Sequence, residues 1–263
     1  MTDFELLTKD KYFTKRELEQ IQYGLNDHMS VEQIAIYATP WFDADQMAEI
    51  RLGFERGLSM EQINMYADPK YENNQMEEIR LGLHHNLSVK QIKLYADPQF
   101  DWTQMAEIRL GFERGLSAEQ INMYADPKFK RYQMGEIRLG FEYGLSIKQV
   151  SLYADPSNDS DEMAVYRLQI IQNIKDGIDS DIYFTELAKY EKMGLTSDFA
   201  KDLAEAAGKG LSSKKLDYVL HSGLTKNQIK FILHNATNNI DKKITDEKTG
   251  VRSKKQKKEN IVR

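Results

Sequence analysis

The chain has 263 residues, a net charge of −5 and no cysteine. The lack of cysteine excludes disulfides, iron–sulfur clusters and cysteine-bound zinc. No apolar run approaches the roughly 18 residues of a membrane span, and the first residues lack the basic start and apolar stretch of a signal peptide. We therefore expect a cytoplasmic protein without a membrane partner.

Charge is unevenly distributed along the chain. Residues 1–200 carry 21 Lys and Arg against 34 Asp and Glu, a net of −13. Residues 201–263 carry 15 Lys and Arg against 7 Asp and Glu, a net of +8. A basic end of this kind is typical of nucleic-acid binding or of an acidic partner, and it also arises where charge serves solubility alone.

All the prolines of the chain lie 29 residues apart, and each closes the phrase Tyr-Ala-Asp-Pro or, in the first case, Tyr-Ala-Thr-Pro. They are Pro40, Pro69, Pro98, Pro127 and Pro156. A fixed period between 20 and 50 residues indicates stacked repeats. The predicted fold is all-α: an α-solenoid of helix-pair repeats, in which each repeat packs only on its neighbours.

The first repeat is predicted from about residue 11 to residue 39, and the clearest copy is the next one, residues 40–68. There, Met47, Ile50 and Phe54 lie on one stripe of a long helix, which is predicted over residues 45–56. No proline interrupts this segment, and most of its residues favour helix.

The second half of the same copy predicts a turn and a short helix. Gly57 stands where a helix ends in a left-handed residue. Ser59 and Gln62 have the spacing of a capping box, which predicts a short helix from residue 60 to about residue 67. The Asp-Pro dipeptide that follows ends this helix, because a residue before proline is displaced from the α region.

The same pattern repeats three more times and then becomes irregular. Clear copies cover residues 40–68, 69–97, 98–126 and 127–155. In the sixth copy the mid-helix glycine is replaced by Gln169, and the turn glycine comes late, at Gly177. We therefore predict about six repeats over residues 1–168, a divergent helical C-terminal region over 169–240, and a basic, flexible tail over 241–263.

Glycine recurs inside each long helix, where it costs about 0.5–1 kcal/mol relative to alanine. The clearest examples are Gly53, Gly82, Gly111 and Gly140. We expect the close approach of a neighbouring helix backbone to explain this preference.

An arginine column has the same period and allows two interpretations. Its members are Arg51, Arg80, Arg109 and Arg138. These arginines either form a row of contacts to anions, or they pair with the acidic columns of the repeat. The acidic columns begin at Glu49 and at Asp68.

Variable positions cluster in two places of the repeat. One is the end of the long helix, which reads Glu-Arg at residues 55–56, His-His at 84–85, Glu-Arg at 113–114 and Glu-Tyr at 142–143. The other is the loop after each proline, where the best candidates for partner contacts are Trp102, Lys130, Arg131 and Tyr132. Trp, Tyr and Arg dominate binding hot spots, although drift at solvated positions also explains such variation.

The sequence contains no recognisable catalytic or metal-binding motif. There is no His-Glu-x-x-His, no Gly-x-Ser-x-Gly and no calcium-binding loop. The neighbouring His84 and His85 diverge on a helix and cannot hold one ion together. We expect a protein that is not an enzyme and has no cofactor.

The recurring motifs Gly-Leu-Ser-x-Glu-Gln-Ile, Tyr-Ala-Asp-Pro and Gln-Met-x-Glu-Ile-Arg-Leu-Gly resemble short helical repeats of uncharacterised proteins from phages and bacterial mobile elements. The resemblance covers about residues 11–168 and implies an accessory or counter-defence role. The repeats are also weakly similar to those of mitochondrial transcription termination factors, a similarity that implies binding to duplex nucleic acid. A repeat surface that binds duplex nucleic acid is expected to be basic, whereas the repeat array of this chain is acidic.

These observations predict a non-enzymatic binding protein, a scaffold or inhibitor that engages another protein through its repeat surface. An alternative is nucleic-acid binding through the basic C-terminal region, where a cluster is formed by Lys254, Lys255, Lys257 and Lys258. A further alternative is an acidic array that mimics nucleic acid and blocks a basic protein.

Overall fold

A computed structural model describes residues 1–240 of the chain, and within this range every regular element is a helix. The predicted all-α class is therefore confirmed. The chain divides into two compact units, Met1–Ala164 and a second that begins at Val165, close to the boundary expected after residue 168. The basic tail, with its four clustered lysines, lies outside the described residues.

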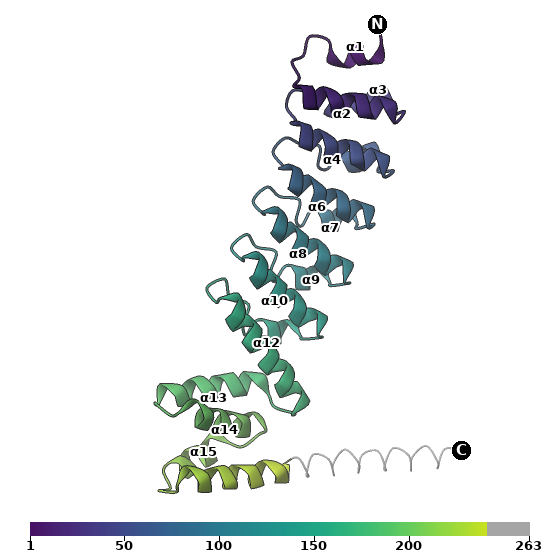
Figure 1. Cartoon of the computed structure of the whole chain (residues 1–263). Coiled ribbons are helices and arrows are strands. Elements are labelled where there is room, and N and C mark those ends of the chain that lie inside the picture. The colour runs from purple at the N-terminus through teal and green to yellow at the C-terminus, as the bar shows by residue number, and fades with distance from the viewer. Residues whose placement is uncertain (241–263) are drawn as a thin grey trace, which may run out of the picture. The chain divides into compact units, whose positions relative to one another are not determined.

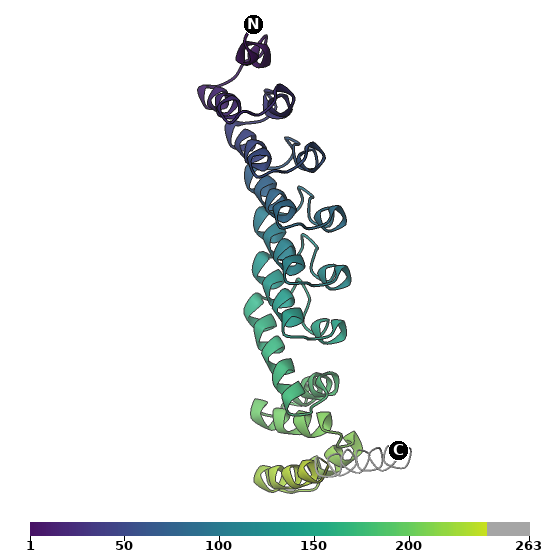
Figure 2. The same ribbon diagram turned by 90° about the vertical axis from the view of Figure 1, so that its right-hand side faces the viewer.

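The first unit consists of alternating long and short helices (Figure 1). The long helices are α2 (Lys15–Asn26), α4 (Ala44–Glu55), α6 (Asn73–His84), α8 (Trp102–Glu113) and α10 (Arg131–Glu142). The short helices are α3 (Val31–Tyr37), α5 (Met60–Ile63), α7 (Val89–Ile92), α9 (Ala118–Ile121) and α11 (Ile147–Val150). Each long helix packs against the next long helix, and Figure 2 shows the short helices in a second row beside them.

The helix α1 (Asp3–Thr8) precedes the repeats and was not predicted. It begins with a capping box in which the Thr2 hydroxyl accepts from the Glu5 N–H, and the Glu5 carboxylate accepts from the Thr2 N–H. It packs against α2 and α3 and buries Leu7. The first repeat thus has a cover at its N-terminal side.

Local capping explains where the helices of a repeat begin and end. Gly57 has φ +82°, the left-handed conformation expected after a long helix. The Ser59 hydroxyl accepts from the Gln62 N–H at 3.2 Å, and the Gln62 side chain accepts from the Ser59 N–H at 2.9 Å. The helix α5 ends at Ile63, earlier than predicted, because the Met65 and Tyr66 N–H groups bond to carbonyls three residues back.

The mid-helix glycines accommodate a tyrosine of their own repeat. The buried Tyr66 hydroxyl donates to the Glu49 carbonyl at 3.2 Å, and a Cβ on Gly53 would lie 2.0 Å from that hydroxyl oxygen. The expectation of a neighbouring helix backbone was wrong, because the close group is a tyrosine side chain from the turn after the short helix. The same bond is donated by Tyr37 to Gln20, Tyr95 to Glu78, Tyr124 to Glu107 and Tyr153 to Glu136.

A buried glutamine fixes the loop of the following repeat. The Gln104 amide donates to the carbonyls of Pro127 and Phe129, at 3.1 and 2.6 Å, and accepts from the Asp101 N–H at 2.8 Å. Equivalent donor bonds are made by Gln46, Gln75 and Gln133. The aromatic residue at the second position of each of these loops is buried: Phe42, Tyr71, Phe100 and Phe129.

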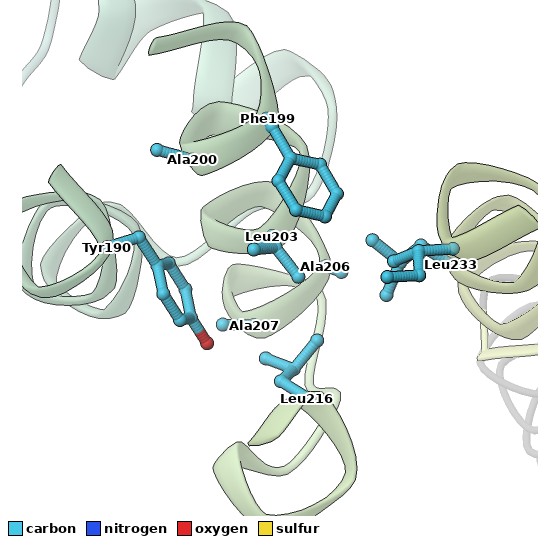
Figure 3. Packing of buried hydrophobic residues seen from close by; sticks show 9 residues of the cluster. Tyr190, Phe199, Ala200, Leu203, Ala206, Ala207, Leu216 and Leu233 are labelled. Carbon is cyan, nitrogen blue, oxygen red and sulfur yellow. The ribbon is translucent and has the colours of Figure 1, made fainter. Parts of the chain in front are cut away.

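The second unit has its own hydrophobic core. Its helices are α13 (Ser180–Lys192), α14 (Ser197–Gly208), α15 (Ser213–Leu220) and a helix over residues 226–240, and the helix α12 (Ser160–Lys175) crosses the division between the units. Figure 3 shows Leu203 and Ala207 of α14 amid Tyr190 of α13, Leu216 of α15 and Leu233 of the last helix. Glycines with positive φ follow α13, α14 and α15, as the Gly-Leu phrases of the sequence suggest: Gly194, Gly210 and Gly223.

Candidate functional site

The arginine column joins consecutive repeats. Arg80 Nε donates to Glu49 Oε2 at 2.7 Å. The same bond is made by Arg109 to Glu78 at 2.7 Å and by Arg138 to Glu107 at 2.9 Å. Arg51 donates instead to Gln20, which occupies the glutamate slot of the first repeat. Of the two interpretations, the structure supports pairing with the column that begins at Glu49.

The second acidic column has another task. Asp68 Oδ1 accepts from the Lys70 N–H at 3.1 Å, across the intervening proline. The same bond recurs at Asp97, Asp126 and Asp155. These aspartates stabilise the turn between repeats, as Asp side chains do when they accept from their own backbone.

A second glutamate extends each ion pair within the repeat. Arg109 Nη1 donates to Glu113 Oε1 at 2.6 Å, and His85 Nδ1 of the preceding repeat lies 2.7 Å from the same oxygen. Burial acts to raise the pKa of Glu113, but the bonds from His85 and Arg109 outweigh it and lower the pKa. Equivalent pairs join Arg51 to Glu55 and Arg138 to Glu142.

The predicted partner-binding residues lie at the N-terminal ends of two long helices that pack side by side (Figure 1). Trp102 is the first residue of α8, and Arg131 occupies the same position in α10. Tyr132 follows Arg131, and Lys130 is the N-cap of α10. We call these four residues the loop patch.

Side chains of the loop patch are accessible to a partner. Tyr132 is 69 % exposed and Trp102 is 44 % exposed, and both Lys130 and Arg131 are exposed. The Arg131 guanidinium lies 5.4 Å from the Tyr132 ring centroid, and its Nε lies 3.8 Å from Glu107 Oε1. Arg131 is thus oriented by its neighbours while about half of its side chain stays exposed.

The second unit contains a groove that the sequence did not indicate. It has a volume of about 600 Å³ and lies between α15 and the helix over residues 226–240. Tyr218, Val219 and Ile232 contribute apolar surface, and Lys214 and Lys215 contribute charge. The one signal of this groove in the sequence is Tyr218, an aromatic residue on the polar side of α15. Its side chain is exposed in the structure.

More than half of the basic excess of residues 201–263 lies beyond the described residues. Residues 165–240 carry 10 Lys and Arg against 9 Asp and Glu, a net of +1. Residues 241–263 carry 9 against 4, a net of +5. The nucleic-acid site predicted at Lys254, Lys255, Lys257 and Lys258 lies outside the described residues and stays a prediction.

Within residues 1–240, no three His, Asp or Glu side chains are grouped so that they hold a metal ion. None of the helices in this range has both the length and the apolar character that crossing a membrane requires. Comparison with protein-family models, with curated proteins and with solved structures finds no match.

Proposed function

We propose that the chain is a non-enzymatic binding protein, a scaffold or inhibitor whose repeats form an α-solenoid and present the loop patch to another protein. The observation that carries this proposal is the exposure of Trp102 and Tyr132 on neighbouring helices. Trp, Tyr and Arg dominate the energy of binding interfaces, and here all three types lie together on neighbouring helices.

The way in which the loop patch is fixed to the repeats supports the same proposal. Gln104 fixes the loop that leads into Lys130, and the buried Phe129 fixes it from the other side. A surface held in its binding conformation loses little conformational entropy when a partner docks.

The charge of the patch indicates what kind of partner segment it prefers. Residues 1–164 carry 17 Lys and Arg against 28 Asp and Glu, a net of −11. The loop after Pro127 departs from this average, because Lys128, Lys130 and Arg131 are all exposed cations. We therefore propose an acidic segment with apolar side chains, because complementary charges favour association and select the partner.

A comparison of two variants tests the proposal. One carries Trp102→Ala, Arg131→Ala and Tyr132→Ala, and the matched control carries Asn73→Ala and Asn74→Ala at equivalent positions of the preceding repeat. Proteins captured from the source cell by the parent and by the control, and lost with the triple variant, would support the loop patch. Retention by a triple variant that melts like the parent would place recognition elsewhere.

A second candidate function is nucleic-acid binding by residues 241–263, which their net charge of +5 favours. Its test is a comparison of the full chain with a chain that ends at residue 240. We expect the full chain alone to bind DNA or RNA, with an affinity that falls steeply with salt concentration. Equal binding by the two proteins, or none at about 50 mM salt, would exclude it.

The repeat resemblance supports a setting for the first proposal, an accessory or counter-defence protein of a phage or mobile element. In that setting the partner is a host protein, and the chain acts by occupying its surface.

A further inference from the structure

Among the four clear copies, one lacks the glutamate that extends the ion pair. The residue four positions after the arginine is Glu55, Glu113 or Glu142 in three of these copies, whereas the copy over residues 69–97 has His84. His84 is exposed and makes no hydrogen bond within the described part of the chain. The repeat has therefore lost a carboxylate at a position where three related repeats keep one.

The arginine of this repeat is left incompletely bonded. Arg80 is only 3 % exposed, its Nε donates to Glu49, and its Nη2 lies 3.7 Å from Glu77. Its Nη1 is buried and has no hydrogen-bond partner among residues 1–240. In the other copies this nitrogen donates to the glutamate four residues later, so the unbonded atom marks the missing carboxylate.

In the next repeat, the glutamate at the equivalent position is held by a second residue besides the arginine. Glu113 is held both by Arg109 and by His85 of the repeat before it. The residue equivalent to His85, 29 positions earlier, is Arg56. Burial raises the pKa of Glu49, while Arg80 and, more weakly, Arg56 act to lower it.

We propose that Arg80 and Arg56 form a binding site for a carboxylate group, supplied by an acidic side chain of a protein partner, at the position where this repeat has His84 in place of a glutamate. The carboxylate would accept from Arg80 Nη1 as Glu113 accepts from Arg109, after the exposed His84 ring moves aside. Arginine suits this task because its guanidinium keeps its charge and presents several donors at fixed angles.

This site is separate from the loop patch. His84 is the last residue of α6, whereas Trp102 and Arg131 are the first residues of α8 and α10. Because these lie at opposite ends of the long helices, loss of binding at one site leaves the other intact. The carboxylate site can therefore fail its test while the proposed function stands, and the reverse also holds.

The first test uses acetate as the probe and follows the guanidinium ¹⁵N signals of the full chain by NMR. We expect acetate to shift the Arg80 signals saturably, while the Arg109 signals, whose Nη1 is already bonded, change little. Sodium chloride at the same ionic strength serves as the reference. Equal responses of Arg80 and Arg109, or no response of Arg80, would overturn the proposal.

The second test fills the site from within the chain. His84→Glu introduces the residue of the three other copies, and His84→Gln removes the imidazole without adding a carboxylate. We expect acetate binding to weaken about tenfold or more in H84E, which corresponds to about 1.4 kcal/mol, near the lower end for a hydrogen bond to a charged group. H84Q should bind acetate at least as well as the parent.

Two outcomes of this second test would contradict the proposal. One is an unchanged acetate response in an H84E protein whose circular dichroism matches that of the parent. The other is a stronger response to inorganic phosphate than to acetate at equal ionic strength, because it would assign the site to a different class of anion.

Discussion

At the scale of single residues, the repeat contains pairs in which each residue requires the other. Tyrosine and mid-helix glycine form one such pair, because the hydroxyl occupies the space that a Cβ would fill. In the sixth copy the glycine becomes Gln169, and Ile182 stands 29 residues after the last tyrosine of the series. Both members of the pair are thus lost together, as expected if each requires the other.

A double-mutant cycle tests this pairing. We expect Gly111→Ala to destabilise the first unit by about 1–3 kcal/mol, because the new Cβ would lie 2.0 Å from the Tyr124 hydroxyl. Tyr124→Phe removes that hydroxyl and should relieve much of the cost in the double variant. Free energies of unfolding from urea titrations measure the coupling. Additive effects on the free energy of unfolding would show that Gly111 is not required to accommodate the Tyr124 hydroxyl.

The pH dependence of stability tests the ion pair around Glu113. Its pKa is lowered from 4.5 in the folded chain, so its contribution is present above about pH 4.5 and is lost as the pH falls through the folded value. We expect Glu113→Gln to lower stability by about 1 kcal/mol at pH 6 and to have almost no effect once the parent carboxylate is protonated. A difference that grows on acidification to pH 3 would contradict this assignment.

At the scale of helices and loops, elements set by local chemistry were predictable and contacts between elements were not. Capping boxes, the left-handed glycine after α4, α8 and α10 and the Asp-Pro turn were all readable, because a few neighbouring residues determine them. The early end of α5 and the partner of the mid-helix glycine were missed, because both depend on how the short helix packs on the long one.

The contacts of the recurring glutamines could not be predicted from the sequence either. Gln46, Gln75, Gln104 and Gln133 recur immediately before the buried methionines, so the signal was present in the sequence. A glutamine at a helix start is normally interpreted as solvated, and only the structure reveals its carbonyl partners in the next repeat. The loop patch was predicted from residue type and from the variable positions after the prolines, and the structure adds that its members share one end of neighbouring helices.

Replacing this glutamine tests its role as a connection between repeats. We expect Gln104→Ala to cost about 2–3 kcal/mol, because two carbonyls of the next loop and the Asp101 N–H lose their partner. Gln120→Ala, at the capping box of the same repeat, is the matched control and should cost about 1 kcal/mol or less. Chemical denaturation of both variants gives the comparison, and equal costs would contradict a special role for Gln104.

At the scale of the molecule, the first unit is a frame of equivalent repeats that differ from one another at a few positions. Over residues 40–155, neighbouring repeats are joined by one arginine–glutamate pair and one glutamine, as at Arg109 and Gln104. The frame thereby leaves the ends of the long helices available for contacts. The loop patch and the site at His84 lie at two such positions.

The most direct measurement of the central claim is the affinity of the captured partner for two tryptophan variants. Trp102 belongs to the loop patch, whereas Trp41 lies in the loop of another repeat and is 77 % exposed, so it is the matched control. By isothermal titration calorimetry we expect Trp102→Ala to weaken binding by about 2 kcal/mol, and Trp41→Ala to change it less than about twofold. An affinity within about twofold of the parent for Trp102→Ala, or equal losses for both variants, would contradict recognition through the loop patch.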